Sequence, residues 1–367
     1  MGISNLICVL AVLITASTCY TQITTIKINY NLDQLTNTAG PNLGYITPIS
    51  DQYSIINFGY VRLAMLNNNN GEVLKEIDET NLASMISEAM SQHATWINYK
   101  LYGLDEQNKI PHLFKARIQY SKVYKVDEQT LAVGVSLPVS KIIPDFASDV
   151  LAGVVFMNHQ LQLKKFIIRE WYHSDLAVTL SCGGYFMNDS SFYISCEVPG
   201  GVTPNPGEHK FMHYALKDGI FKMDKEKGIG ELPRIIDFSV GRSYSIFKQD
   251  YTYYIFNGES LWETADLSCI DIKHKLPLKG QEMFMSLMPV GGRKYAGVVS
   301  DLGDEGAGER GDLVILNKNL SIEKILTRYE FRQFTLNSVE YYNGKIYIYI
   351  VDQKKTFPLL QIIKLNE

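Results

Sequence analysis

The C-terminal stretch "FTLNSVEYYNGKIYIYIVDQKKTFPLLQIIKLNE", residues 334–367, contains three strand-like segments in succession and decides the fold. The first two are joined by Asn343-Gly344, a pair typical of a two-residue hairpin turn. Three strands are one short of a four-stranded unit. The apolar, β-branched segment at residues 23–32, "ITTIKINYNL", can supply the fourth. We therefore expect the N-terminal strand to pair with the C-terminal sheet, which would join the two ends of the chain and remove open sheet edges.

Six further units upstream repeat the order of apolar strand, polar turn and alternating strand. Their turns centre near Asn68, Glu106, His159, Lys225, Ala265 and Lys318. Successive turns are roughly 40 to 65 residues apart, a spacing that suits four strands per unit. The repeat therefore predicts one continuous array of antiparallel sheets after the first residues of the chain.

In this spacing the chain resembles secreted seven-bladed β-propellers as an architecture. The resemblance implies an all-β fold, with six repeated units and a seventh blade shared between the chain ends, in a single domain at residues 20–367. WD dipeptides, kelch glycine pairs and sialidase-type aspartate boxes are absent from the sequence. A pair of β-sandwiches is the alternative fold. The segment 81–93, "NLASMISEAMSQH", is either an inserted helix or the inner strand of the second unit.

The first residues have the pattern of a signal peptide. The apolar run "LICVLAVLITA", residues 6–16, is followed by small residues up to Cys19, so residues 1–19 are expected to be removed. A membrane-spanning helix needs about 20 apolar residues, and this run is shorter. The expected location is extracellular. If the chain is bacterial, a lipid anchor on Cys19 is the alternative.

Charge excludes one large class of partners. The chain has 35 basic and 39 acidic residues and a formal net charge of -4. Nucleic-acid binding normally requires a basic surface, so nucleic acid is not an expected partner. An extracellular protein or glycan remains.

The cysteines predict one disulfide. Cys182 and Cys196 are symmetric about Asp189, so a hairpin that turns there would place them opposite each other. In a secreted protein such a pair is expected to be oxidised, and two buried reduced thiols are the alternative. Cys269 is expected to be reduced and buried.

Two glycosylation sequons begin at Asn188 and Asn319. We expect the first in a turn from an inner to a second strand and the other in a turn from a third to an outer strand. Both turns then lie on one face. The long loops at 138–149 and 199–210, and the loop within the acidic stretch 300–316, would lie on the opposite face, which glycans would leave clear.

The rim of that clear face contains the densest group of chemically capable side chains. It comprises Glu170, Trp171, Tyr172, His173 and Asp175. Aromatic residues there would provide contact area for a protein or a sugar, although they can equally pack under the chain crossover.

Two histidines four residues apart, His209 and His213, are expected on one side of a strand, where they can join a ligand site or coordinate a metal. Polar residues on a blade edge are the plainer interpretation.

The acidic loop "SDLGDEGAGERGDLVI" provides a candidate calcium site. Its carboxylates include Asp301, Glu305, Glu309 and Asp312, and its glycines allow backbone carbonyls to join them. The loop resembles the calcium loops of integrin α-chain propeller repeats, which implies Ca²⁺ as the ion. The tripeptide that begins at Arg310 has the form of an adhesion motif. A solvated acidic loop is the alternative.

Together these features favour a secreted binding propeller that engages a protein or carbohydrate through the face opposite the sequons. A secreted hydrolase or lyase, with or without a divalent cation, is the second hypothesis. No nucleophile motif such as Gly-x-Ser-x-Gly supports catalysis. A matrix or adhesion component is the third.

Overall fold

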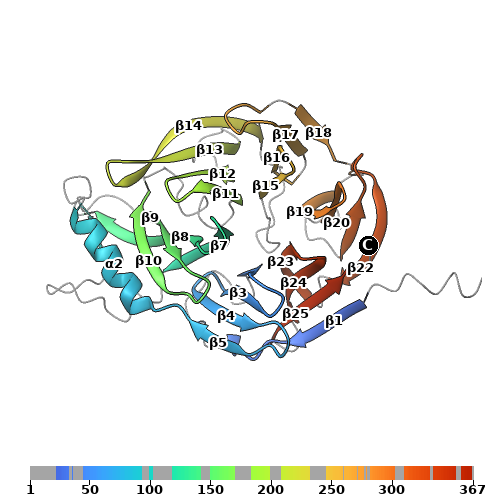
Figure 1. Cartoon of the computed structure of the whole chain (residues 1–367), viewed down its shortest axis with the longest axis horizontal. Helices are drawn as coiled ribbons and strands as arrows, with labels where there is room; N and C mark the ends of the chain where they lie inside the picture. Colours follow the sequence, from blue (N-terminus) through green and yellow to red (C-terminus); the bar gives the residue numbers. More distant parts are fainter. Residues whose placement is uncertain are drawn as a thin grey trace, which may run out of the picture.

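The computed structural model of the chain describes residues 22–32, 35, 44–92, 99–101, 118–141, 149–169, 183–198, 208–231, 245–258, 260–270, 272–276, 278, 282–301, 310–330, 334–352 and 357–365. These residues form an all-β propeller whose sheets are arranged around a central axis (Figure 1).

The described residues form six sheets, named here blades 1 to 6. Blade 1 contains β2 (Gly44–Pro48), β3 (Tyr53–Phe58), β4 (Arg62–Asn67) and β5 (Val73–Glu76). Blade 2 contains β6 (Tyr99–Leu101), β7 (Gln119–Lys125), β8 (Leu131–Lys141), β9 (Asp149–Met157) and β10 (Leu163–Ile168). Blade 3 contains β11 (Gly183–Asn188), β12 (Ser191–Val198), β13 (Glu208–Lys217) and β14 (Ile220–Glu231).

Blade 4 contains β15 (Ser245–Gln249), β16 (Thr252–Phe256), β17 (Ser260–Thr264) and β18 (Ile272–Lys275). Blade 5 contains β19 (Glu282–Gly291), β20 (Lys294–Asp301), β21 (Arg310–Leu316) and β22 (Ile322–Glu330). Blade 6 contains β23 (Phe334–Tyr342), β24 (Lys345–Asp352), β25 (Phe357–Lys364) and β1 (Gln22–Lys27). The innermost strands contact their neighbours in the order β2, β7, β11, β15, β19 and β23, and β23 also contacts β2.

Blade 6 joins the two ends of the described chain. β1 pairs antiparallel with β25, from Gln22 opposite Lys364 to Lys27 opposite Leu359. This pairing is the one expected, although the strand ends at Lys27, before the expected limit of 32. Asn343 and Gly344 both have positive φ, 48° and 73°, as a type I′ hairpin turn requires.

The expectation of seven blades is wrong, because the described residues form six. The segment assigned to the extra blade, around Glu106, begins instead with helix α2 (Glu79–Gln92). Asp78 caps this helix by accepting a hydrogen bond from the backbone N–H of Asn81 at 3.0 Å. After the helix, β6 pairs with β8 and so extends blade 2. Residues 102–117 lie outside the described residues.

A second correction concerns blade 3, where a turn was expected at Lys225. β14 runs through that position without a break, and the β13–β14 turn lies at Asp218 and Gly219, which have φ values of 54° and 82°. The expected turns near Asn68, His159 and Lys318 do separate the third strand of a blade from its outer strand.

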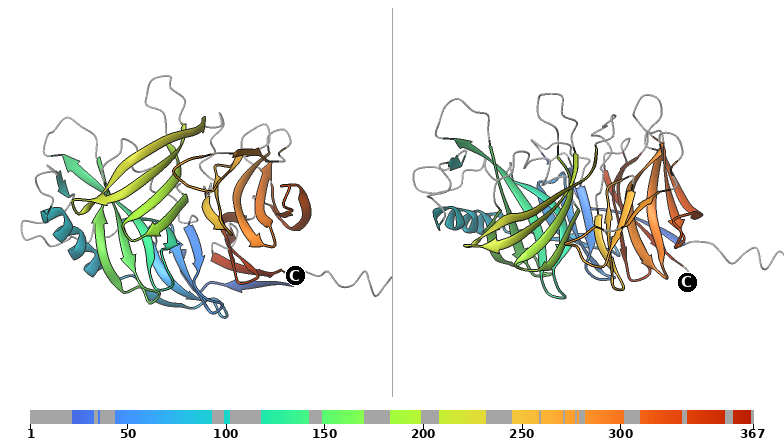
Figure 2. Two further views of the ribbon diagram at one scale, coloured as in Figure 1. Left: turned by 45° about the horizontal axis from the view of Figure 1, so that its top comes forward. Right: turned by 90° about the horizontal axis from the view of Figure 1, so that it is seen from above.

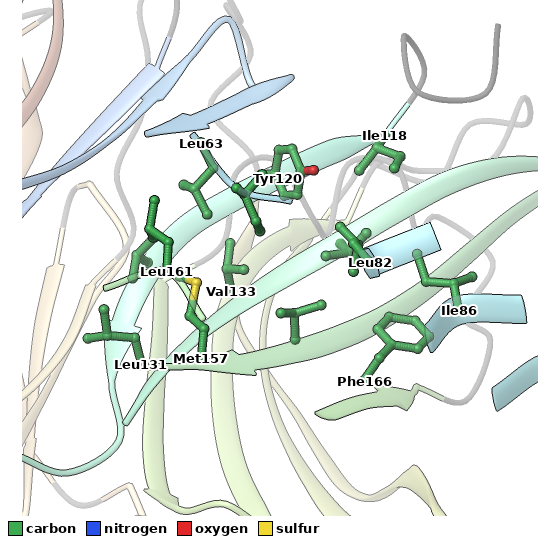
Figure 3. Close-up of a cluster of buried hydrophobic side chains, with 14 of the residues drawn as sticks. Leu63, Leu82, Ile86, Ile118, Tyr120, Leu131, Val133, Met157, Leu161 and Phe166 are labelled. Carbon is green, nitrogen blue, oxygen red and sulfur yellow. The ribbon is translucent and has the colours of Figure 1, made fainter. Parts of the chain in front are cut away.

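Apolar side chains fill the spaces between neighbouring blades. One buried cluster joins blade 1, α2 and blade 2 (Figure 3). Leu82 and Ile86 project from α2 toward blade 2, where Phe166 on β10 packs in the same cluster. Other clusters join blades 2 and 3, 3 and 4, 4 and 5, 5 and 6, and 6 and 1. The blades are thus held by interdigitated faces, and the innermost strands surround the axis.

Candidate ligand site in the axial pocket

A cavity of about 440 Å³ lies on the axis, where the innermost strands of all six blades converge. A volume of this size suits a small-molecule site. Its described lining consists of Thr47, Pro48, Lys122, Val123, Tyr124, Lys125, Gly183, Gly184, Tyr185, Phe186, Ser245, Ile246, Phe247, Lys248, Leu287, Met288, Pro289, Val339, Glu340 and Tyr341. We call this cavity the axial pocket.

The axial pocket lies toward one face of the propeller. β2, β7, β19 and β23 line it with residues from their C-terminal halves, whereas β11 and β15 line it along most of their described length. Each innermost strand leads from that end into the turn before the second strand, as β11 does at Asn188. Tight turns of this kind gather along the lower edge of the molecule in the right-hand view of Figure 2. The described pocket therefore lies nearer the face that contains Asn188 than the face expected from the sequence.

The described lining residues carry a net positive charge, although the chain as a whole carries a net negative charge. Lys122, Lys125 and Lys248 contribute three ammonium groups, and Glu340 contributes the single carboxylate among the described lining residues. The chain as a whole has a formal net charge of -4. A concave site with a local excess of one sign concentrates the field, so this pocket attracts anions.

One of the three lysines is neutralised within the protein. Lys122 on β7 forms an ion pair with Glu340 on β23, and the two side chains are 22% and 20% exposed. These strands belong to blades 2 and 6, and β2 of blade 1 lies between them in the ring. The pair therefore spans the pocket wall in front of β2.

Lys125, at the end of β7, has a different environment. Its ammonium lies 4.3 Å from the ring centroid of Tyr342, a cation–π contact. Burial lowers the pKa of Lys125, and the Glu340 carboxylate opposes that shift. No carboxylate of the described residues forms an ion pair with Lys125. The residue is nevertheless exposed, and its positive charge has no ion-paired carboxylate in the described structure.

Lys248, on β15, is the third lysine. Its ammonium lies 4.8 Å from the ring centroid of Tyr253 and donates a hydrogen bond to the Tyr253 hydroxyl at 3.3 Å. Tyr253 in turn makes an edge contact with Tyr185, with ring centroids 5.4 Å apart. Within the described residues Lys248 also lacks an ion-paired carboxylate. Both lysines are therefore held against tyrosine rings near the lining.

Half-buried aromatic residues line the pocket together with the charged groups. Tyr124, Tyr185, Phe247 and Tyr341 all line the pocket and are partly exposed. Such rings offer apolar faces, and the tyrosines add hydroxyl groups that can donate and accept hydrogen bonds. The pocket can therefore bind a ring that carries both polar groups and negative charge.

A smaller cavity, of about 50 Å³, lies between blades 2 and 3. Its wall includes Arg169, which is 5% exposed and donates a hydrogen bond to the Tyr214 hydroxyl at 2.8 Å. Gly153 keeps this region tightly packed, because a Cβ there would lie 2.3 Å from the Phe166 ring. Its volume has room for little more than solvent.

The aromatic rim expected as the main site lies outside the described residues. This holds for Glu170, Trp171, Tyr172, His173 and Asp175. Arg169, the residue before them, is the last described residue of blade 2. Binding at this rim stays a prediction.

His209 and His213 both lie on β13, with Phe211 between them, so their side chains project from the same side of the strand. They have different environments: His209 is 1% exposed, whereas His213 is partly exposed. Groups of three or more metal-ligating side chains do not occur among the described residues.

His213 is the centre of a hydrogen-bonded line that sequence spacing did not reveal. Its Nε2 lies 2.7 Å from the Ser191 Oγ, and its Nδ1 lies 3.0 Å from the Asp224 Oδ1. Asp224 occupies a bulge in β14, where the register shifts between His213 and Tyr214. Serine, imidazole and carboxylate in this order can transfer a proton from the hydroxyl to the imidazole. Ser191 lines neither of the two cavities described above.

The acidic loop is described only at its ends. Asp301 is the last residue of β20, and Glu305 and Glu309 lie outside the described residues. Asp312 lies within β21, and Arg328 binds both of its carboxylate oxygens, at 2.7 and 3.0 Å. This bidentate pair engages both carboxylate oxygens of Asp312, and calcium binding by the loop stays a prediction. The tripeptide from Arg310 to Asp312 belongs to a paired strand rather than to a loop.

The sequon asparagines lie where the sequence placed them. Asn188 stands at the β11–β12 turn and Asn319 at the β21–β22 turn, and both are exposed. The side-chain oxygen of Asn188 accepts a hydrogen bond from the Ser190 N–H at 2.8 Å. Glycan attachment at either residue stays a prediction.

The predicted disulfide and the predicted state of Cys269 have different outcomes. In the β11–β12 hairpin Gly183 pairs with Ser195, the register that would place Cys196 opposite Cys182 if it continued by one residue. Cys182 lies outside the described residues, so the disulfide stays a prediction. Cys269 forms no disulfide, as expected, but it is exposed rather than buried. It follows Ser268 in a loop anchored by Asp266 rather than lying in a blade core.

Comparison with known proteins identifies no family. No protein-family model matches the chain, and no curated protein sequence matches it. Among solved structures, the computationally designed Ika8 protein has a TM-score of 0.39 and 6% identity, over 93% of this chain and 99% of that one. BamB from Moraxella catarrhalis has a TM-score of 0.31 and 10% identity, over 86% of this chain and 70% of that one. These values are too low to support a functional argument.

No helix in the described part of the chain has the length and apolar character needed to cross a membrane.

Proposed function

We propose that this chain is a binding propeller that recognises an extracellular protein or carbohydrate at the axial pocket. The observation that carries the proposal is a cavity of about 440 Å³ in which Lys125 and Lys248 lack ion-paired carboxylates among the described residues. Charged groups placed in a concave, partly aromatic site are a common feature of ligand sites.

The proposed setting is extracellular, and it comes from the sequence. The signal-like residues 1–19 and the sequons at Asn188 and Asn319 support it. The rim around Trp171 and His173 is proposed as a further contact surface on the opposite face, because its residue types suit a protein or sugar. That surface has its own test, since Trp171→Ala should weaken binding only if the rim takes part.

The axial pocket is tested by filling it. Ser245 begins β15 and lines the pocket with a small, partly exposed side chain. In Ser245→Trp an indole would occupy the space that a ligand needs. We expect the wild-type protein to bind members of an immobilised glycan array or a panel of secreted proteins, and Ser245→Trp to lose those signals while its circular dichroism is unchanged. Equal binding by a folded Ser245→Trp protein would place the site elsewhere.

The line from Ser191 to Asp224 favours a second candidate function, that of a hydrolase acting on esters. Ser191 Oγ would attack the acyl carbon while His213 Nε2 takes the hydroxyl proton and then returns it to the leaving alkoxide. Water would release the acid from the acyl-enzyme and regenerate the serine. Asp224 would hold the imidazole through Nδ1.

A fluorophosphonate probe tests this candidate directly, because it labels only a serine activated as a nucleophile. The hydrolase hypothesis predicts labelling of Ser191, loss of labelling in His213→Gln, and retained labelling in Ser195→Ala. Absence of labelling at Ser191 would leave the three residues as a structural hydrogen-bonded line in blade 3.

A further inference from the structure

The geometry points to an anionic saccharide as the ligand of the axial pocket: a sugar ring that carries a carboxylate or a sulfate. This inference rests on the proposed function and narrows it to one chemical class. It follows from the arrangement of charge, aromatic rings and space within the pocket.

The positive charge available to a ligand comes from two lysines. Glu340 already neutralises Lys122, whereas Lys125 and Lys248 form no ion pair with a carboxylate of the described residues. Each ammonium lies against a tyrosine ring, at 4.3 Å for Lys125 and 4.8 Å for Lys248. These contacts restrict the lysine side chains before a ligand arrives. Restricting a side chain in advance reduces the entropy lost on binding.

The two lysines approach the axis from different blades. Lys125 ends the innermost strand of blade 2, and Lys248 lies on the innermost strand of blade 4. The innermost strand of blade 3, β11, lies between them in the ring, and Tyr185 on β11 lines the pocket. A ligand in the pocket therefore meets an aromatic residue between two cationic residues.

The remaining lining suits a sugar ring. Tyr124, Phe247 and Tyr341 offer partly exposed rings for its apolar faces, and Ser245 adds a hydroxyl group for its own hydroxyls. An α-helix with its side chains is about 10 Å across, so a cavity of about 440 Å³ would accept roughly one helical turn of a protein partner. One or two sugar rings use the same space more completely.

The test measures binding of three fluorescent oligosaccharides of equal length by anisotropy at low salt: oligogalacturonate, its methyl ester and a heparin fragment. The ester removes the charge and keeps the rings. We expect at least one anionic probe to bind, and oligogalacturonate to bind at least about tenfold more tightly than its ester if the carboxylate is the recognised group. Tighter binding of the heparin fragment would assign the anion as sulfate.

Substitutions of single lysines test which positive charges the ligand contacts. Lys125→Gln and Lys248→Gln should each weaken the anionic probe by about tenfold, the effect of one charge-assisted hydrogen bond. Lys273→Gln is the matched control, because Lys273 also lies over an aromatic ring, at 5.2 Å from Trp262, but does not line the pocket. Binding should also weaken as the salt concentration rises.

The outcomes separate this inference from the proposed function. If the ester binds as tightly as the acid and Ser245→Trp abolishes both, the axial pocket is a ligand site but the anionic class is wrong. If the acid binds equally to wild type and Ser245→Trp, the pocket itself is wrong. If neither anionic probe binds, or if both lysine variants bind as the control does, the inference is overturned.

Discussion

The sequence allows strand-like segments both in blade 6 and in the segment from Ile77 to Leu101, yet only the first region forms a separate blade. In β24 every residue after Lys345 is buried, and the Asn343-Gly344 turn aligns it with β23. In the other segment Leu82 and Ile86 are four residues apart and lie on one helical face against blade 2. The difference shows that the spacing of buried residues within a segment, continuous in β24 and four residues apart in α2, decides whether that segment forms a blade strand.

Removing β1 should have the largest effect. Proteins that begin at Gln22 and at Ile28 differ only by the strand paired with β25. Without it, β25 has an exposed, unpaired edge whose backbone groups can pair with other chains. We expect the shorter protein to aggregate or to melt at a much lower temperature, as measured by size-exclusion chromatography and thermal circular dichroism. Similar melting of the two proteins would show that blade 6 needs only three strands.

Truncating a buried residue of α2 tests whether the helix is part of the core. Leu82 is fully buried in the cluster it shares with blade 2. Leu82→Ala should lower the free energy of unfolding by about 2 to 5 kcal/mol, as cavity-forming substitutions do. Urea denaturation measures the change, and Glu88→Ala, at an exposed position on the same helix, is the control. Equal stability of the two variants would mean that α2 only covers the surface.

A glycine substitution isolates the contribution of the blade 6 turn. Gly344 has a φ of 73°, and a Cβ there would meet no atom within 4 Å, so only backbone strain opposes Gly344→Ala. The expected loss is about 1 kcal/mol. Gly344→Asn, with a residue that tolerates positive φ, should recover part of it. If alanine is as stable as glycine, the side-chain pattern alone sets the register of β23 and β24.

The smallest expected effect is a difference in acid sensitivity. Burial is the main factor that lowers the pKa of His159, in the β9–β10 turn of blade 2, below its ordinary 6.5, and the charge of Lys125 adds to the shift. Its neutral form is therefore favoured in the folded state. The resulting contribution to stability is complete above pH 6.5 and declines as the pH falls below that value. No histidine occurs in the sequences of the blade 6 strands.

Thermal melts at pH 7.5 and pH 5.0 check this prediction. The wild-type protein should lose more stability between these values than His159→Gln does. An identical pH dependence in the two proteins would show that protonation of His159 does not contribute.

The β23–β24 hairpin was predictable because its signals are local. Asn343-Gly344 specifies a turn by its backbone preference, and alternating Ile and Tyr specify the strand beside it. The register of β11 and β12 was predictable for the same reason, from the symmetric turn at Asp189. α2 was harder to assign, since the four-residue spacing of Leu82 and Ile86 fits one face of a helix and one face of a strand alike.

The axial pocket was not predictable, because its residues come together only when six blades converge. Lys122 and Lys125 lie on β7 and Lys248 lies on β15, and nothing in the sequence places these two strands beside a common cavity. The hydrogen-bonded line formed by Ser191, His213 and Asp224 depends on a β-bulge in β14, and no turn motif in the sequence predicts this bulge. Sequence reasoning favoured the loops, where polar residues cluster, over the inner strands.

The pairing of β1 with β25 has a consequence for biosynthesis. Gln22 is synthesised 342 residues before its partner Lys364. At about 5 to 20 residues per second, translation leaves the first strand without its partner for tens of seconds. During that interval an exposed β-strand can pair with other chains. Newly made protein is therefore most vulnerable to aggregation before β25 is synthesised, and we expect chaperones that bind extended segments to occupy β1 until then.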